Sequence, residues 1–429
     1  MTSAIDSPGT VQRPTRVRFA VVGMAILLGM VTYLDRGCIG TLEEPIMHDL
    51  GLSKYQYGSA LTAFAMAYGG FGILSAWWGD RVGTRIMLTA VVLAWSGFTM
   101  ATAAAQGMIS LVAIQFCFGA AESGAWPAVT RTLSRWIPYR ERGRAQGIVW
   151  IGAHITIAVT PMVVLALRQF ISWRCIFGLF GLTGLVWAAV WYGWFRDEPS
   201  HHAQVNGAEL AHIMAGRKSA TTDNRPRGWL FWWRLLTDRN VLALCLMYMP
   251  NSFIFYFCIT WFHNYLDKGR HMKGWELAFF TGLPLLMSVA TDVLGGVTTD
   301  WAVRHFGTRW GRTGVGFGSY VVAGSCVLLA ALVPEAWLTA TLFALGTAVN
   351  MFPLGSAWGT CQDIGGRHAG VVSATMNTAG QMAAMTCPLL VPYLEKHYQW
   401  NTAPMLIGAS FLLASLCWFF IDPRKKVFD

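Results

Sequence analysis

Twelve stretches of roughly twenty mostly apolar residues run through this chain of 429 residues. Each is long enough for an α-helix to cross the hydrocarbon core of a bilayer. They are continuous rather than alternating, which excludes a transmembrane β-barrel. The sequence therefore predicts an all-α, multi-pass membrane protein. Its predicted helices cover residues 17–40, 59–78, 86–105, 108–130, 145–167, 174–195, 240–266, 277–298, 312–333, 336–358, 369–391 and 402–421.

Composition supports a membrane protein and excludes several other classes. Hydrophobic residues make up 54% of the chain and charged residues 13%, whereas soluble domains carry about 25% charge. The nine cysteines are scattered singly, without a C-x-x-C pair, so we expect buried apolar thiols and neither disulfides nor a metal site. We expect no cofactor, no nucleic-acid partner and no enzyme activity, because no nucleophile–base pair or metal cluster is visible.

The distribution of basic residues predicts the orientation. With the N-terminus inside the cell, 24 of the 32 Lys and Arg residues fall in cytoplasmic segments, 7 in external segments and one within a helix. Cytoplasmic loops of membrane proteins are enriched in Lys and Arg. Both termini are thus predicted to be cytoplasmic. The net charge of +10 reflects these loops rather than a nucleic-acid partner.

A long polar segment divides the predicted helices into two sets of six. We predict a cytoplasmic tail over 1–16, a six-helix bundle over 17–195, a cytoplasmic loop over 196–239, a second bundle over 240–421 and a tail over 422–429.

The two halves share an internal sequence repeat. Gly-Thr-Arg follows an acid and a base after the second helix (79–85) and again after the eighth (300–309). Internal repeats of this kind are typical of secondary transporters. The chain lacks a G-x-x-x-x-G-K-[ST] phosphate loop, so the sequence gives no sign of an ATP-driven pump.

Charged residues inside the predicted helices point to the functional site. Each costs about 2.5–3.5 kcal/mol at mid-membrane. Arg36 keeps its proton and holds carboxylates with two parallel hydrogen bonds, and Tyr33 lies one turn earlier on the same face. This pair suits an anionic, hydroxylated substrate. A purely structural pair of Arg36 with Asp35 or Glu122 is the alternative. Glu122 lies among small residues, so burial there favours a carboxyl that takes up and releases protons at physiological pH.

The chain resembles the major facilitator superfamily, and within it the anion:cation symporter family, which includes galactonate and hexuronate permeases and the sialin carriers. The resemblance spans nearly the whole chain. It is carried by Tyr33-Leu34-Asp35-Arg36, Gly79-Asp80-Arg81-Val82-Gly83-Thr84-Arg85, 119–128, Glu141-Arg142-Gly143, Trp173-Arg174, Thr260-Trp261-Phe262, Tyr265-Leu266 and 377–381.

This resemblance implies roles for further residues. Asp35 and Glu122 would carry the coupled protons, and Tyr68 would face the substrate. Ser356 and Trp358 lie near positions where related carriers contact their ligand. Asp80, Arg81 and Arg85 would form a cytoplasmic latch rather than bind substrate.

Polar residues elsewhere complete the predicted pocket. Asn377 and Gln381 are four residues apart on one helix, where their amides suit substrate hydroxyls. The family often has an arginine where this chain has Gln115. The missing cation favours a monocarboxylate, and it weakens the inference of the usual proton coupling. Asp292 is predicted to line a cavity or cap a broken helix, and His154 and His263 to be packing residues.

Together these features predict a proton-coupled symporter of a small organic anion, such as a sugar acid, working as a monomer in a bacterial inner membrane. The alternatives are a proton-driven exporter or antiporter, an uncoupled facilitator and, more remotely, a transporter-like sensor.

Overall fold

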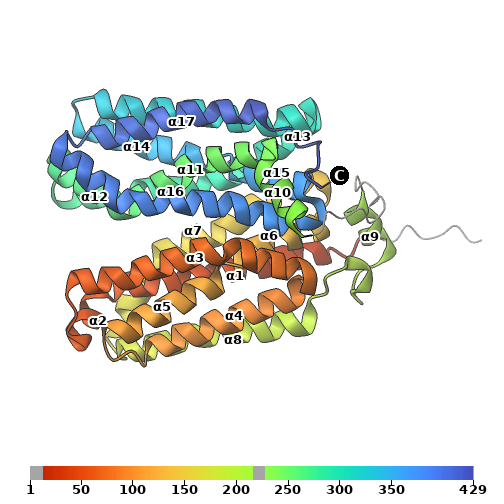
Figure 1. The fold of residues 1–429 in the computed structure, drawn as a ribbon, viewed down its shortest axis with the longest axis horizontal. Helices are drawn as coiled ribbons and strands as arrows, with labels where there is room; N and C mark the ends of the chain where they lie inside the picture. Colours follow the sequence, from red (N-terminus) through yellow and green to blue (C-terminus); the bar gives the residue numbers. More distant parts are fainter. Residues whose placement is uncertain (1–12, 216–227, 429) are drawn as a thin grey trace, which may run out of the picture.

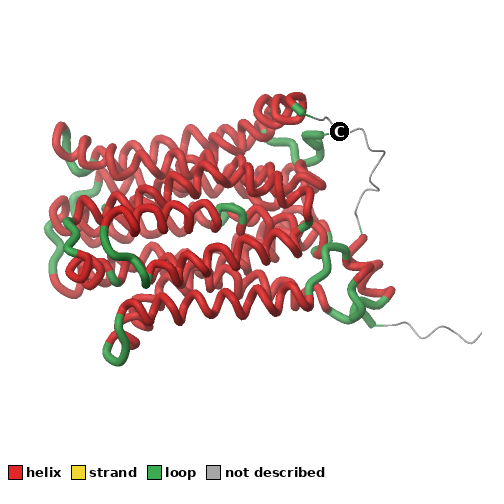
Figure 2. The backbone as a smooth tube through the Cα atoms, turned by 60° about the horizontal axis from the view of Figure 1, so that its bottom comes forward, coloured by secondary structure: helices red, strands yellow, loops and turns green. Residues whose placement is uncertain are grey.

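The computed structural model describes residues 13–215 and 228–428, a part of the chain that is almost entirely helical and contains no strand (Figure 2). Residues 1–12 of the predicted tail, 216–227 of the predicted central loop and Asp429 lie outside the described residues.

The helices form two halves that lie side by side (Figure 1). The first half contains α1 (Val17–Thr41), α2 (Glu43–Leu50), α3 (Lys54–Val82), α4 (Thr84–Thr102), α5 (Met108–Glu122), α6 (Ala125–Trp136), α7 (Arg142–Arg168) and α8 (Trp173–Trp194). The second contains α11 (Arg239–Thr260), α12 (Phe262–Asn264), α13 (Gly274–Leu332), α14 (Ala336–Met351), α15 (Leu354–Gly365), α16 (Ala369–His397) and α17 (Thr402–Phe420).

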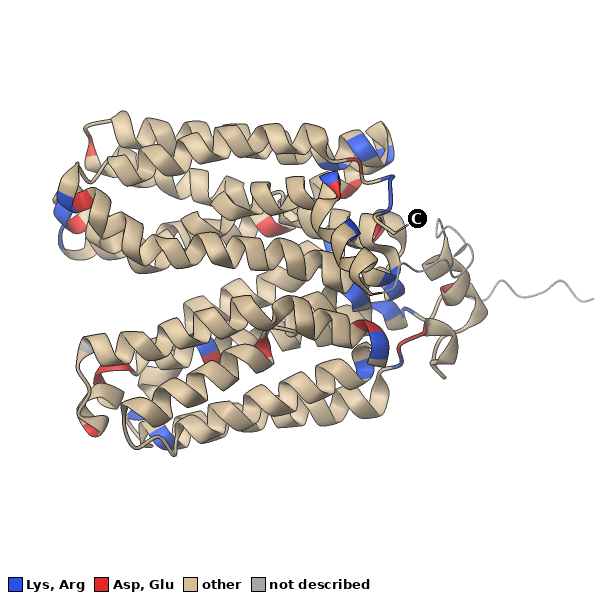
Figure 3. Ribbon diagram, in the orientation of Figure 1, with Lys and Arg blue, Asp and Glu red and all other residues tan. Residues whose placement is uncertain are grey.

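Two short helices, α9 (Gly207–Met214) and α10 (Trp229–Thr237), lie between the halves in sequence. They sit at the same end of the molecule as the start of α1 and the end of α17 (Figure 1). We call this the terminus end, and the opposite end, with α2 and α12, the far end. Charged residues gather at these two ends and are sparse between them (Figure 3).

The twelve predicted membrane helices are confirmed in the described part of the chain. Ten helical stretches have the length and hydropathy of a membrane crossing. Two of these, Gly274–Leu332 and Ala336–His397, each hold two crossings. The consecutive helices α5 and α6 make one crossing, as do α14 and α15.

The internal repeat is visible in the backbone. Gly83 separates α3 from α4 with φ of 89°, and Gly307 divides α13 into two crossings with φ of 76°. Both glycines begin a Gly-Thr-Arg sequence, and glycine adopts this left-handed region without a steric penalty. The fourth crossing of each half is interrupted, after Glu122 in one and after Met351 in the other.

Short polar caps and close backbone contacts hold the helices in place. Ser53 begins α3 in a capping box with Gln56, and Asp238 accepts hydrogen bonds from the first backbone amides of α11. Between α3 and α5, Gly119 lies directly against the backbone carbonyl of Phe64. Small residues allow membrane helices to approach this closely.

We expect Gly119→Ala to destabilise the first half by about 1–3 kcal/mol, because its Cβ would overlap the α3 backbone and force the helices apart. Gly97→Ala in α4 is the matched control, since a Cβ at Gly97 meets nothing within 4 Å. The measurement is the melting temperature of the two purified variants. Equal melting temperatures would show that α3 and α5 separate without cost.

Candidate functional site

A cavity of about 240 Å³ lies between the two halves, near the middle of the helices. Residues of α1, α3, α5, α6, α7, α11, α14, α15 and α16 line it, so both halves contribute. Its polar lining residues are Tyr33, Arg36, Tyr68, Gln115, His154, Tyr248, Asn251, Ser252, Tyr256, Thr260, Asn377 and Gln381.

The only arginine of this lining is held by a buried carboxylate. Arg36 Nε donates to Glu122 Oε1 at 2.7 Å, and the Glu122 side chain is 0% exposed against 18% for Arg36. Within the described residues, Arg36 Nη2 and Glu122 Oε2 make no hydrogen bond. The pair anticipated as a structural alternative therefore exists, yet it leaves part of the guanidinium available to a ligand.

Aromatic rings surround the guanidinium on the cavity side. Its central carbon lies 4.4 Å from the ring centre of Tyr68, 5.1 Å from that of Phe64 and 5.5 Å from that of Tyr33. Such rings attract a cation through their electron-rich faces and keep water away from it. Tyr33 and Tyr68 thus lie where the sequence analysis expected them, around Arg36.

The second half contributes neutral hydrogen-bonding groups to the cavity. Asn377 Nδ2 donates to the Tyr68 hydroxyl at 3.4 Å, across the two halves. The Tyr256 hydroxyl donates to Gln381 Oε1 at 3.2 Å. Gln115 also lines the cavity, and its amide donates to Thr102 at 3.4 Å. Five predicted substrate-binding residues therefore meet around one space with Arg36.

Besides Glu122, three residues that were predicted to bind substrate or protons lie off the cavity surface. Ser356 is fully buried and donates to the Arg312 carbonyl at 3.0 Å. Trp358 is also fully buried, and its indole donates to Tyr248, which does line the cavity. Asp35 points elsewhere in the first half, 2% exposed, and neither of its carboxylate oxygens has a hydrogen-bond partner in the described structure.

The cavity is closed toward the terminus end by contacts that include Asp80. Its carboxylate pairs with Arg131 of α6 at 3.1 Å and with His368, at the start of α16, at 2.8 Å. The His368 contact crosses the two halves. Of the other predicted latch residues, Arg81 stacks on Trp77 and Arg85 donates to the Tyr192 carbonyl, so both stay within the first half.

A second carboxylate repeats this arrangement in the other half. Asp300 accepts hydrogen bonds from the backbone amides of Gly143 and Arg144 at 3.1 and 2.9 Å, at the N-terminus of α7. A carboxylate is stabilised there by the helix dipole. Because Asp80 lies at the start of α16, the two halves exchange equivalent contacts. Sequence analysis placed Asp300 in the repeat without giving it this role.

A buried triad also joins the halves at the terminus end. Asp363 of α15 pairs with Arg142 of α7 at 3.1 Å and with Arg312 of α13 at 2.7 Å. At the far end, by contrast, the ion pairs found among the described residues stay within one half, as in Arg174–Asp49 and Lys273–Asp267. The halves are therefore fastened together at the terminus end.

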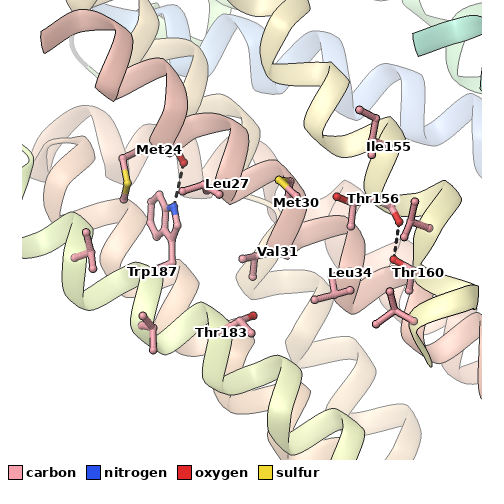
Figure 4. Close-up of a pocket in the computed structure, with 14 residues that line it drawn as sticks. Met24, Leu27, Met30, Val31, Leu34, Ile155, Thr156, Thr160, Thr183 and Trp187 are labelled. Atoms are coloured by element: carbon pink, nitrogen blue, oxygen red, sulfur yellow. Dashed lines mark hydrogen bonds between the residues drawn. The ribbon is translucent and has the colours of Figure 1, made fainter. Parts of the chain in front are cut away.

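A larger groove of about 490 Å³ lies on the outside of the first half, between α1, α7 and α8 (Figure 4). Its lining is almost wholly apolar and includes exposed side chains such as Leu27, Met30 and Val159. Apolar groups exposed at this depth suit lipid chains. The smaller cavity, which holds the charged and polar groups, is therefore the candidate functional site.

The sequence analysis missed two features of the site. The histidine predicted to be a packing residue, His154, lines the cavity and contacts Asp292. The breaks in the fourth crossing of each half were also not predicted. Pro353, directly after Phe352, was a usable signal for the second break.

Comparison with known proteins agrees with this architecture. The family profile described as Major Facilitator Superfamily matches residues 25–386. The chain belongs to the major facilitator superfamily. The fold of this superfamily consists of twelve helices in two halves, as found here. Among solved structures, the proton:xylose symporter XylE has a TM-score of 0.72 at 14% identity, covering 95% of this chain and 96% of that one, which supports the fold alone.

Curated relatives narrow the group within the superfamily. A probable sulfoacetate transporter of Cupriavidus necator is 31% identical over 96% of this chain and 95% of its own length. A probable galactarate/D-glucarate transporter of Bacillus subtilis is 27% identical, covering 97% and 94%. A D-galactonate transporter of Escherichia coli is 25% identical, covering 97% and 98%. The predicted resemblance to the anion permeases is confirmed, as is the prediction that the chain is a transporter rather than an enzyme.

We expect Asp80→Asn to slow transport without changing the ranking of substrates, because Asp80 fastens the terminus end and lies outside the cavity. Initial uptake rates of two anions into proteoliposomes measure both effects. Asp422→Asn is the matched control: hydrogen bonds from Arg424 lower the pKa of Asp422 to about 2, so this variant also removes a negative charge at the terminus end. A changed substrate ranking in Asp80→Asn would contradict the latch role.

Proposed function

We propose that this protein is a proton-coupled symporter of a small organic anion, a sugar acid or a similar monocarboxylate. It would act as a monomer in a bacterial inner membrane, with both termini in the cytoplasm. The observation that carries the proposal is Arg36, a cavity-lining cation with a guanidinium nitrogen, Nη2, that makes no hydrogen bond in the described structure. A carboxylate is the natural ligand of such a group.

Charge balance provides the reason for proton coupling. Arg36 and Glu122 together are neutral, which suits a buried position. An anion that binds Arg36 adds one negative charge to this site. A proton on Glu122 restores neutrality and frees Nε of Arg36 for the anion. Binding of the anion and binding of a proton therefore favour each other.

The environment of Asp35 supports a second proton-binding residue in the first half. Both of its oxygens are buried without a hydrogen-bond partner in the described structure, and an ionised carboxylate in that position would be costly. We infer that Asp35 is a neutral acid in this conformation and loses its proton when movement of α1 opens a path to water.

The cavity chemistry favours one anionic end and several hydroxyls on the substrate. The cavity lining contains one arginine, Arg36. Gln115 also lines the cavity, at the position where a second cation would bind a second anionic group of a substrate. Tyr68, Asn377 and Gln381 provide hydrogen bonds of the kind that sugar hydroxyls accept and donate. The relative named for D-galactonate matches this description with one carboxylate and several hydroxyls, whereas the galactarate and D-glucarate of another relative's name are hydroxylated acids with two carboxylates.

The contacts between the halves support an outward-open state. The distribution of basic residues favours a cytoplasmic terminus end, and the cross-half pairs of Arg142 with Asp363 and of Asp80 with His368 lie at that end. Transport would require these contacts to break while the far ends approach each other, the alternating access of paired six-helix halves.

We expect Arg36→Lys to raise the KM for uptake about 10- to 100-fold and Arg36→Ala to abolish uptake, because lysine keeps the charge but loses the forked geometry. The assay is uptake of labelled galactonate, glucarate and sulfoacetate into proteoliposomes with an alkaline interior. The exposed Arg168 provides the control variant Arg168→Lys. Wild-type rates in Arg36→Ala for every transported acid would refute the assignment of the anion site.

We expect Glu122→Gln and Asp35→Asn to lose accumulation driven by a pH gradient while Glu122→Gln keeps exchange of internal for external anion. Glutamine still accepts a hydrogen bond from Arg36 but carries no exchangeable proton. The two measurements are uptake with the interior alkaline and counterflow at equal pH. Undiminished accumulation by Glu122→Gln would exclude Glu122 from coupling, and wild-type uptake that never exceeds equilibrium would favour an uncoupled facilitator.

A further inference from the structure

One ionisable pair in the middle of the molecule, of which the histidine lines the cavity, has no part in the anion binding or proton coupling proposed so far. His154 Nδ1 of α7 lies 2.5 Å from Asp292 Oδ2 of α13, and the two side chains are 2% and 0% exposed. The other carboxylate oxygen, Oδ1, has no hydrogen-bond partner within the described residues. This contact joins the first half to the second.

The pair lies at one end of a row of close contacts between α7 and α13, which we call the seam. From the terminus end, Gly143 meets Asp300, and then Gly147 lies against the backbone carbonyl of Asp292. His154 follows two turns later and lines the cavity. Beyond it on α7, Ile157 lines the cavity as well. The pair therefore lies where the closely packed seam meets the cavity.

The surroundings of the pair are aromatic and uncharged. Trp150 stacks on the imidazole at 5.9 Å between ring centres, and Phe255 lies 6.2 Å away. Arg36, the one Lys, Arg, Asp or Glu residue of the cavity lining, is already paired with Glu122. Asp300 lies two turns further along α13, at the N-terminus of α7. The other ionisable groups of the same cavity are Tyr33 and Tyr68 from the first half and Tyr248 and Tyr256 from the second.

Such a setting favours one proton shared by the pair. With one proton beyond a neutral histidine and an ionised aspartate, the pair has no net charge. Without that proton it leaves a negative charge in a dry site, and with a second proton it leaves a positive one. Both charged forms are costly when buried. Water that reached the seam would lower that cost, so proton loss and separation of α7 from α13 favour each other.

We propose that His154 and Asp292 form a further proton-binding site of this transporter, which holds a proton while α7 and α13 are in contact and releases it as the seam opens toward the terminus end. The proposal extends the symport proposed above, because it adds a proton that crosses with the substrate. His154 takes the proton from the cavity, and the opening of the seam exposes Asp292 to the opposite side.

Hydrogen–deuterium exchange of the full chain in lipid nanodiscs, without substrate, tests the link between proton and seam. We expect exchange in peptides covering 143–157 and 288–300, corrected for the intrinsic pH effect, to rise about tenfold in the wild type between about pH 6 and pH 8.5. In His154→Gln/Asp292→Asn, whose two amides keep a hydrogen bond but do not titrate, the rise should disappear. Asp300 is intact in both proteins and contributes equally.

Two further variants serve as a control and as a substitute for the double variant. His263→Gln removes a histidine at the far end that contacts Thr281 and should retain the wild-type pH profile. If the double variant elutes as an aggregate, His154→Gln alone is used, and its profile should differ from the wild type. An unchanged pH dependence in a folded variant without the imidazole would overturn the proposal.

Proton counting in proteoliposomes separates this proposal from the proposed symport. With an internal pH dye and labelled galactonate, glucarate or sulfoacetate, the double variant should move one proton fewer per anion than the wild type. A wild type that moves anions without protons would refute the symport, whereas the exchange comparison stands on its own. A proton count that is equal in wild type and double variant would overturn the further site alone.

Discussion

The ion pair between Arg36 and Glu122 is the interaction on which the rest of the site depends. At mid-membrane each charge alone would cost about 2.5–3.5 kcal/mol, and the pair reduces this cost because its net charge is zero. Only one guanidinium nitrogen is used in the bond that fixes the pair, which leaves Arg36 able to bind an anion. The aromatic rings of Phe64 and Tyr68 lie beside the guanidinium on the cavity side. The same pair therefore accounts for stability without substrate and for a charge imbalance when substrate arrives.

Some of the contacts that close the terminus end are individually weak. Asp80 and Asp300 each lie at the N-terminus of a helix from the opposite half, where a carboxylate gains about 0.3–2 kcal/mol. A few interactions of this size keep two conformations within a few kcal/mol of each other, as alternation requires. The buried Asp363 between two arginines is costlier to separate from its partners. It pairs with Arg312 in its own half, so that opening of the halves leaves the carboxylate partnered.

Much of this architecture could be predicted from the sequence, because a bilayer imposes length and composition on each crossing. The twelve helices, the repeat at Gly83 and Gly307, and the mid-membrane positions of Arg36 and Glu122 all follow from local patterns. Contacts between distant segments could not be predicted in this way. Nothing near His154 in sequence indicates Asp292, and nothing near Ser356 shows that its hydroxyl is used by the Arg312 carbonyl. Pairing across halves depends on the register of two packed helices, which no periodicity within one helix reveals.

The two halves divide the chemistry of the cavity between them. The first half holds the charge, since Arg36 and Glu122 both belong to it, while the second half presents amides and hydroxyls such as Asn377 and Tyr256. When the neutral second half closes over a bound anion, water is removed from the anion and from the charged groups of the first half. This loss of water costs little only if those charges sum to zero. An anion without its proton would therefore hold the halves apart. Asp292 is the second half's one carboxylate near the cavity among the described residues, and it meets a histidine rather than the substrate. In the mechanism proposed above, the closing movement would depend on protons on both sides of the seam.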